Sequence, residues 1–181
     1  MRPRALLIGG TLCAAAGYLA AQSRTFNAVT PAMLASPDPN DWLMYNRTYD
    51  AQRFSPLKQI DRTNVGQLRM AWSRQQGPGA QESIPLVHDG IMYVLAPGGS
   101  LEALDATTGD LKWTYTRKLP DTERNGSRSK VIALGQNMVY WTAPDAVVAI
   151  DASSGEVRWE AKTDRRGQTS GAVMAGDKVI S

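Results

Sequence analysis

Ala103-Leu-Asp-Ala-Thr-Thr-Gly-Asp-Leu-Lys-Trp113 decides the fold, because its pattern returns as Ala149-Ile-Asp-Ala-Ser-Ser-Gly-Glu-Val-Arg-Trp159. The aspartate, the glycine and the tryptophan of the two stretches match at a spacing of 46 residues. The agreement extends upstream, where residues 92–97 match residues 139–144 at a spacing of 47. A repeat of about 40 to 50 residues is typical of propellers, solenoids and other arrays of repeated units.

Each copy of the repeat predicts a small antiparallel meander. The short apolar runs 101–104 and 147–150 lead into Asp-Ala-x-x-Gly, a turn with an aspartate acceptor at its start and a glycine suited to positive φ. The chain then alternates polar and apolar residues up to Trp113 or Trp159, as half-buried strands do. One such sheet cannot bury its faces alone, so a tryptophan at a constant position favours a seam between neighbouring copies.

The pattern Ala-x-Asp-x-x-x-Gly-x-x-x-Trp after an apolar strand resembles the tryptophan-docking repeat of the quinoproteins, the eight-bladed β-propellers of the pyrroloquinoline quinone (PQQ)-dependent alcohol dehydrogenase family. The resemblance implies an all-β fold in which the tryptophan of each blade packs against the turn of the next blade. At roughly 40–45 residues per blade, 181 residues are too few for eight blades. We therefore expect a partial eight-bladed β-propeller, roughly its first two blades with an N-terminal arm, as an N-terminal fragment of a longer protein.

The N-terminus predicts export. Arg2 and Arg4 precede the apolar run 5–21, which ends in small residues, so residues 1–21 are expected to form a signal peptide and the protein to be periplasmic. An uncleaved membrane anchor is the alternative, because the run approaches the roughly 17–25 residues of a membrane span. Cys13 is the only cysteine, and the mature part would therefore lack a cysteine zinc site or a Cys-x-x-Cys-His haem motif.

The composition indicates a globular protein, with 43% hydrophobic residues and few charges. Of 20 lysines and arginines, two lie in the signal segment, which leaves 18 against 17 acidic residues. A nucleic-acid partner is not expected from this charge balance.

The remaining chain divides into three expected parts. Residues 22–40 form a linker or arm with a helical turn near 31–35, residues 41–72 form a segment with an outer strand, and residues 73–181 form the blades. Segment 41–72 resembles the stretch that precedes the first blade in quinoprotein alcohol dehydrogenases and packs against the last. It predicts a turn at Ser55-Pro56, a short helix capped by Asp61 or Thr63 and a strand that ends at Trp72. Four aromatic residues are expected to anchor this arm: Trp42, Tyr45, Tyr49 and Phe54. Arg47 and Arg53 are expected to be structural hydrogen-bond donors, and none of the six is expected to be catalytic.

Glu82 is the first candidate site residue. It follows a Gly/Pro loop and begins the expected strand 82–87, where residues alone would indicate a solvated glutamate. The resemblance implies instead that this acid, in the family's Gln-Glu-x-x-Pro, hydrogen-bonds PQQ. His88, the lone histidine, lies in the expected hairpin turn His88-Asp89-Gly90, and we expect no catalytic role for it.

Lys130, Arg128 and Thr169 are the other candidate cofactor residues. The resemblance implies that a basic residue at the start of strand 130–134 pairs with the quinone carboxylates, which need compensating charge when they lose water. Lys130 and Arg128 share one face of an extended chain, so either or both can serve. Thr169 matches the threonine of the family's Thr-Gly-Ala-Pro, which would donate to the quinone; an ordinary threonine at a strand start is equally consistent.

One departure from the family pattern concerns Gly126-Ser127, where many alcohol-oxidising members carry two adjacent cysteines. Subgroups without this pair exist, so PQQ binding stays compatible, while the methanol- and ethanol-type subclasses come into doubt. The resemblance also places the ligands of the Ca²⁺ or lanthanide ion and the catalytic aspartate beyond Ser181. No metal ligand and no catalytic residue is therefore expected within this chain.

These features favour the N-terminal part of a periplasmic dehydrogenase that oxidises an alcohol by hydride transfer to PQQ and passes electrons to an acceptor such as a cytochrome c. The chain alone is expected to be inactive. A non-catalytic propeller, such as the lipoprotein scaffold of outer-membrane β-barrel assembly, is the alternative, and a truncated product without function is a third. Leu12 before Cys13 makes a poor lipoprotein site, which argues against the scaffold together with segment 41–72 and Glu82.

Overall fold

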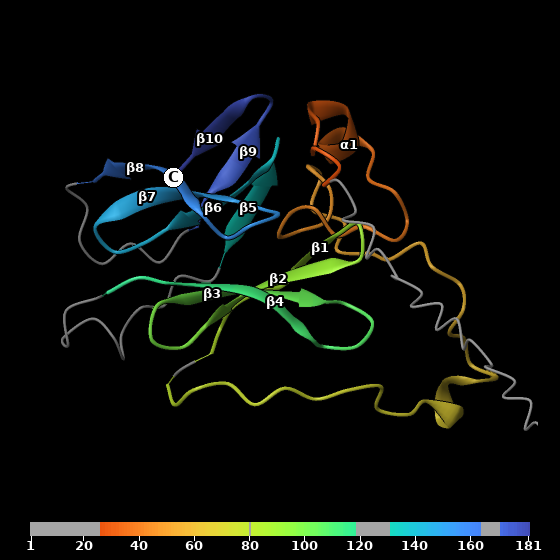
Figure 1. Ribbon diagram of the computed structural model, residues 1–181. Helices are drawn as coiled ribbons and strands as arrows, with labels where there is room; N and C mark the ends of the chain where they lie inside the picture. Colours follow the sequence, from red (N-terminus) through yellow and green to blue (C-terminus); the bar gives the residue numbers. More distant parts are fainter. Residues whose placement is uncertain (1–25, 80, 119–130, 164–170) are drawn as a thin grey trace, which may run out of the picture.

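Two four-stranded antiparallel sheets and a two-stranded hairpin form the body of the computed structural model, which describes residues 26–79, 81–118, 131–163 and 171–181 (Figure 1). The first sheet contains β1 (Leu86–His88), β2 (Ile91–Ala96), β3 (Ser100–Asp105) and β4 (Leu111–Thr116). The second contains β5 (Ile132–Gly135), β6 (Met138–Thr142), β7 (Ala146–Asp151) and β8 (Val157–Lys162). The hairpin pairs β9 (Val173–Ala175) with β10 (Lys178–Ile180). Strand order follows the chain in each sheet, so the predicted meanders and the partial propeller fold are confirmed.

The same turn joins the third and fourth strands of both sheets. Oδ1 of Asp105 and of Asp151 accepts hydrogen bonds from the backbone N–H groups two and three residues later, at 2.9 to 3.3 Å. Gly109 and Gly155 close the turns with φ of +78° and +77°, a region that glycine adopts without steric cost. The predicted turn is confirmed in both copies.

Tryptophans join each unit to the next. The indole Nε1 of Trp113 donates to the backbone carbonyl of Ala152 at 3.0 Å, and its ring covers Gly155 so closely that a Cβ there would lie 2.7 Å away. Trp72 repeats the contact one unit earlier, since it donates to the carbonyl of Ala106 at 3.2 Å and covers the glycine of the first turn. The predicted seam is confirmed, and each turn glycine is needed for space as well as for φ.

The N-terminal arm ties the two sheets together. Its helix α1 (Pro31–Ala35) begins after Thr30, whose Oγ1 accepts from the N–H of Met33 at 3.3 Å. In Figure 1 this helix lies above β1. Val29 forms a bridge with Gln136 in the β5–β6 turn, while Trp42 forms one with Val87 in β1. The expected helical turn and the expected anchoring by Trp42 are both confirmed.

Segment 57–79 departs from two of our predictions. Neither Asp61 nor Thr63 caps the short helix η1 (Val65–Gln67): Asn64 occupies the N-cap position without a side-chain capping bond, and the carboxylate of Asp61 accepts from Thr63 in the preceding turn. The strand predicted to end at Trp72 is not formed. Among the described residues, no neighbouring strand forms backbone hydrogen bonds with this stretch. The side chain of Trp72 nevertheless docks on the first turn as expected.

The core runs through both sheets and the arm. Every residue of β7 is buried, whereas every residue of the outermost strand β8 is exposed. The side chains of Leu34 and Leu43 from the arm belong to the same buried cluster as the sheets. Within the described ranges, no helix has the length and apolar character of a membrane span.

Candidate functional site

The first strands of successive units, β1, β5 and β9, contact one another in order. Because the units repeat one another, the residues that precede these strands gather at one end of the assembly. The sequence-predicted site residues all precede such strands: Glu82 before β1, Lys130 and Arg128 before β5, and Thr169 before β9. The topology therefore brings the starts of β1, β5 and β9, which the predicted residues precede in the sequence, to the same end.

Glu82 is exposed on a backbone that β2 holds in place. The side-chain amide of Gln81 donates to the carbonyl of Leu95 at 2.7 Å, and the hydroxyl of Ser83 accepts from the N–H of the same residue at 3.1 Å. An exposed carboxylate is chemically suited to accept a hydrogen bond from a ligand. The role of Glu82 toward PQQ stays a prediction that this geometry permits.

Lys130, Arg128 and Thr169 lie outside the described residues, and their roles stay predictions. The strand starts that follow them are in close contact. A Cβ added to the buried Gly171 would overlap the carbonyl oxygen of Val131, so β5 and the chain entering β9 pack backbone to backbone at this end.

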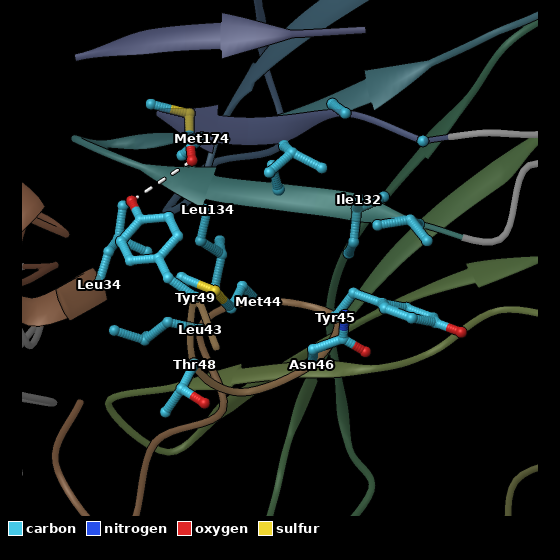
Figure 2. Close-up of a pocket in the computed structure, with 15 residues that line it drawn as sticks. Leu34, Leu43, Met44, Tyr45, Asn46, Thr48, Tyr49, Ile132, Leu134 and Met174 are labelled. Atoms are coloured by element: carbon cyan, nitrogen blue, oxygen red, sulfur yellow. Dashed lines mark hydrogen bonds between the residues drawn. The ribbon is translucent and has the colours of Figure 1, made fainter. Parts of the chain in front are cut away.

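A cavity of about 300 Å³ lies between the arm and strands β5 and β9 (Figure 2). The arm segment 43–49 forms one wall, and residues 131–134 with 171–174 form the other. Its apolar lining includes Leu34, Leu43, Met44, Ile132, Leu134 and Met174. The polar side chains that line it, those of Tyr45, Asn46, Thr48 and Tyr49, all come from the arm.

The arm loop over this cavity has an unusual backbone. Arg47, Ala51 and Arg53 have φ of 68°, 58° and 51°, in the left-handed region that residues other than glycine rarely adopt. Such conformations persist only where surrounding contacts enforce them, and they cluster at functional sites. The loop is tied to the opposite wall by the hydroxyl of Tyr49, which donates to the carbonyl of Met174 across the cavity at 3.3 Å.

The sequence predicted only a packing role for this loop, and its pattern gave no sign of the cavity. The aromatic residues 45 and 49 were visible, but no local pattern indicates that β9, more than 120 residues away, supplies the facing wall. Non-glycine residues with positive φ carry no sequence signature either. The missed residues are therefore those whose partners are distant in the sequence.

The predicted anchors of the arm have mixed outcomes. Nε of Arg53 donates to Oδ1 of Asn46 at 2.6 Å, and its guanidinium lies 5.3 Å from the ring centre of Tyr45. Arg47 is buried and donates to a backbone carbonyl of the arm at 3.5 Å, while its Nε has no hydrogen-bond partner among the described residues. Phe54 is 65% exposed, so its predicted anchoring is wrong for the described structure. Nothing local covers it, because the following segment runs away from the sheets.

His88 holds the arm against the first sheet. It is the last residue of β1 and is buried, with the hairpin turn formed by Asp89 and Gly90, whose φ are both positive. Its Nδ1 lies 2.8 Å from a carboxylate oxygen of Asp41, and its Nε2 lies 2.7 Å from the carbonyl oxygen of Asn27. Through its two ring nitrogens, His88 thus joins β1 to two separate positions of the arm.

Ion pairs reinforce the seam between the sheets. Arg117 after β4 pairs with Asp145 at 2.8 Å and with Glu160 at 2.9 Å. The hydrogen bond to Asp145 raises the pKa of Arg117, and the same bond holds the pKa of Asp145 below its usual value. In the described part of the chain, no three His, Cys, Asp or Glu side chains are arranged to hold a metal ion.

Comparison with known proteins places these features in a family. Residues 42–131 match the PQQ family model described as glucose/ethanol/alcohol dehydrogenase, beta-propeller domain. The dehydrogenase subunit of an alcohol dehydrogenase (quinone) from Komagataeibacter europaeus is 36% identical over 173 residues, and the match covers 87% of this chain and 23% of that protein.

Two solved structures show the same arrangement. The quinohemoprotein alcohol dehydrogenase ADHIIG from Pseudomonas putida HK5 matches with a TM-score of 0.65 and 34% identity, over 77% of this chain and 22% of that one. A europium-containing methanol dehydrogenase matches with a TM-score of 0.69 and 28% identity, over 82% of this chain and 28% of that one. The chain thus spans between 22% and 28% of the length of these relatives.

Proposed function

Because the chain belongs to the PQQ-dependent alcohol dehydrogenase family of β-propellers, we propose that it is the N-terminal part of a periplasmic dehydrogenase that oxidises an alcohol by hydride transfer to PQQ. The observation that carries this proposal is the order of the inner strands. Tryptophan docking holds successive units in register, and this register gathers Glu82 and the starts of β5 and β9 at one end.

The candidate residues fit a tricarboxylate quinone. Glu82 would accept a hydrogen bond from the cofactor, Lys130 with or without Arg128 would balance its carboxylates, and Thr169 would donate a hydrogen bond. The quinone, when bound, supplies the two-electron acceptor, and a Ca²⁺ or lanthanide ion held elsewhere in the dehydrogenase supplies a Lewis acid. The chain's own contribution is one edge of the pocket, so the 181 residues alone would be inactive.

The proposal also includes the location of the dehydrogenase, its substrate class and its electron acceptor. The basic and apolar N-terminus, residues 1–21, would direct export to the periplasm. The substrate class is a small alcohol, and the electron acceptor would be a periplasmic protein such as a cytochrome c.

Reconstitution of the whole dehydrogenase tests the proposal. We expect oxidation of primary alcohols with an artificial electron acceptor only after addition of PQQ with Ca²⁺ or a lanthanide. A Glu82→Gln variant is expected to bind PQQ about 10-fold more weakly, measured by cofactor titration, with an unchanged melting temperature of the cofactor-free protein. A folded protein that neither binds PQQ nor oxidises an alcohol would refute the proposal and favour a non-catalytic scaffold.

A further inference from the structure

The cavity under the arm has two unlike ends (Figure 2). Leu134 and Met174 lie at one end beside Tyr49, whose hydroxyl is already committed to a backbone carbonyl. Tyr45 and Asn46 lie at the other end, near Ile132, where β5 begins. The cavity therefore has an apolar body, with the polar side chains of Tyr45 and Asn46 at the end where β5 starts; Oδ1 of Asn46 already accepts from Arg53.

That polar end lies where the chain enters β5 and β9. Val131 lines the cavity and directly follows Lys130, while Gly171 lines it two residues after Thr169. Val131 and Gly171 are described residues at which the chain enters β5 and β9, so this end of the cavity lies at the starts of two inner strands. A molecule with one end at the quinone can thus extend its other end into this cavity.

The size and lining suit a short hydrocarbon. An apolar cavity of about 150 Å³ is enough to bind benzene, and small-molecule sites begin at about 300 Å³, the volume found here. Met44 projects into the middle of the space from the arm, and an unbranched thioether adapts readily to ligands of different shape. The wall that carries it includes the left-handed Arg47, a strain that a purely space-filling loop does not require.

We propose that this cavity binds the hydrocarbon chain of the alcohol substrate and that Met44 sets the chain length it admits. This inference rests on the proposed function, because it orients the hydroxyl end of the substrate toward the quinone. Tyr45 and Asn46 then border the hydroxyl end, and Leu134 with Met174 receives the terminal methyl group. The N-terminal arm is thereby a specificity element of the dehydrogenase as well as an anchor.

Methyl NMR of the whole dehydrogenase without cofactor tests binding directly. With ¹³C-methyl methionine, titration with ethanol, 1-butanol and 1-hexanol is expected to shift the methyl signals of Met44 and Met174 in a saturable way. The half-saturating concentration should fall about fourfold for each added methylene, which is the ~0.8 kcal/mol of a buried CH₂. Met70, which is 81% exposed outside the cavity, is the internal control and should not shift.

Opposite substitutions at one position test chain-length selection in the enzyme loaded with PQQ and metal. Met44→Trp fills the cavity, so kcat/KM for 1-hexanol relative to ethanol should fall by about 10-fold or more. Met44→Ala enlarges it and should shift the preference toward longer or branched alcohols. Phe54→Ala, an exposed aromatic truncation on the same arm, should leave the ratio as in the wild type.

Two results would overturn the inference: methyl signals of Met44 and Met174 that do not respond saturably to 1-hexanol, or identical chain-length ratios in both Met44 variants and the wild type. A general folding defect lowers activity on every alcohol and cannot move the ratio in opposite directions. If the wild-type enzyme oxidises no alcohol with PQQ, the proposed function fails on that ground, and the methyl titration still decides whether the cavity binds alkanols.

Discussion

The two four-stranded sheets share one turn and one tryptophan position, yet they differ in how deeply these features are buried. The carboxylate-bearing side chain of Asp105 is 35% exposed, whereas that of Asp151 is 11% exposed. Trp113 at the edge of the first sheet is docked, whereas Trp159 at the edge of the second is 41% exposed. The repeated motif therefore determines the local geometry, while the neighbouring unit determines the burial.

In the aromatic pairs, too, the local geometry is the same in both sheets and only the burial differs. Tyr93 and Trp113 pack with ring centres 6.0 Å apart at an angle of 46°, and Tyr140 and Trp159 pack at 5.9 Å and 46°. One pair is covered, since Tyr93 and Trp113 both donate to the carbonyl of Ala152 at 3.1 and 3.0 Å. The other pair has the same geometry without that carbonyl, so each sheet preforms its docking surface before a neighbour occupies it.

Gly155→Ala is expected to produce the largest loss of stability, about 3 kcal/mol. Roughly 1–2 kcal/mol comes from placing alanine at positive φ, and the rest comes from displacing the Trp113 ring. Gly90→Ala is the matched control, because Gly90 has φ of +74° but nothing within 4 Å of an added Cβ, and it should cost about 1 kcal/mol. Urea unfolding of both variants measures the difference, and equal losses would show that tryptophan docking adds nothing.

Trp113→Phe and Trp159→Phe compare the docked with the undocked tryptophan in the 181-residue chain. We expect Trp113→Phe to lower the free energy of unfolding by about 2 kcal/mol, through the lost bond to Ala152 and the lost packing. Trp159→Phe should cost about 0.5 kcal/mol, because that side chain is largely exposed. Chemical denaturation followed by circular dichroism measures both losses of stability. Equal losses would contradict a stabilising role for the docking of Trp113.

Asp151→Asn tests the more deeply buried turn through its pH dependence. Burial alone would raise the pKa of Asp151, but hydrogen bonds from Ser153 and Arg158 outweigh it, so the pKa lies well below the ordinary value. A lowered folded-state pKa contributes stability above the unfolded pKa of about 3.9, and the contribution is lost as the pH falls through that value toward the folded pKa. We expect Asp151→Asn to cost about 1 kcal/mol at pH 7 and progressively less between pH 5 and pH 2.

Asp105→Asn is the control for that experiment. The pKa of Asp105 is also lowered, chiefly by the backbone hydrogen bond from Thr107, but its side chain is more exposed. Its substitution should therefore change the pH dependence of unfolding less than Asp151→Asn does. A larger effect at Asp105 would contradict the link between burial of the turn and stability.

Tyr93→Phe is expected to have a small effect, about 0.5 kcal/mol, like Trp159→Phe. It removes one of the two donors to the carbonyl of Ala152, and the indole of Trp113 still satisfies that oxygen. The double variant Tyr93→Phe with Trp113→Phe should lose more than the sum of the single variants, because the carbonyl then has neither donor. A thermal unfolding cycle of the four proteins measures this coupling, and strict additivity would count against a shared acceptor.

Much of the local structure was predictable because it depends on residues close together in the sequence. Asp105 and Gly109 define their turn within five residues, and the Asp89-Gly90 hairpin needs only its two central residues. Even the seam was predictable, since a tryptophan at constant spacing repeats one contact. By contrast, the sequence did not predict that Asn64 would occupy the N-cap position of η1 or that Asp61 would accept from Thr63 in the preceding turn.

One part of the candidate site was predictable from the sequence, and another part was not. The inner-strand starts near Glu82, Val131 and Gly171 follow from the repeat, so their gathering at one end was implicit in the register. The cavity was not, because its walls come from the arm loop 43–49 and from β9. Those segments meet through a Tyr49 contact to Met174 that spans 125 positions.

The amino-acid sequence by itself determined the repeat, the meander, the aspartate turn and the docking tryptophan, and with them the β-propeller family. The tertiary structure alone decided which copy of the repeat has its tryptophan covered by a neighbouring unit. It also decided that His88 holds the arm by a hydrogen bond to Asp41 and that the arm encloses an apolar cavity against β5 and β9. The physical reason is range: hydrogen bonds within a turn and alternation along a strand are set by neighbouring residues. Burial, strain in the arm loop and the shape of a cavity depend on side chains that only folding brings together.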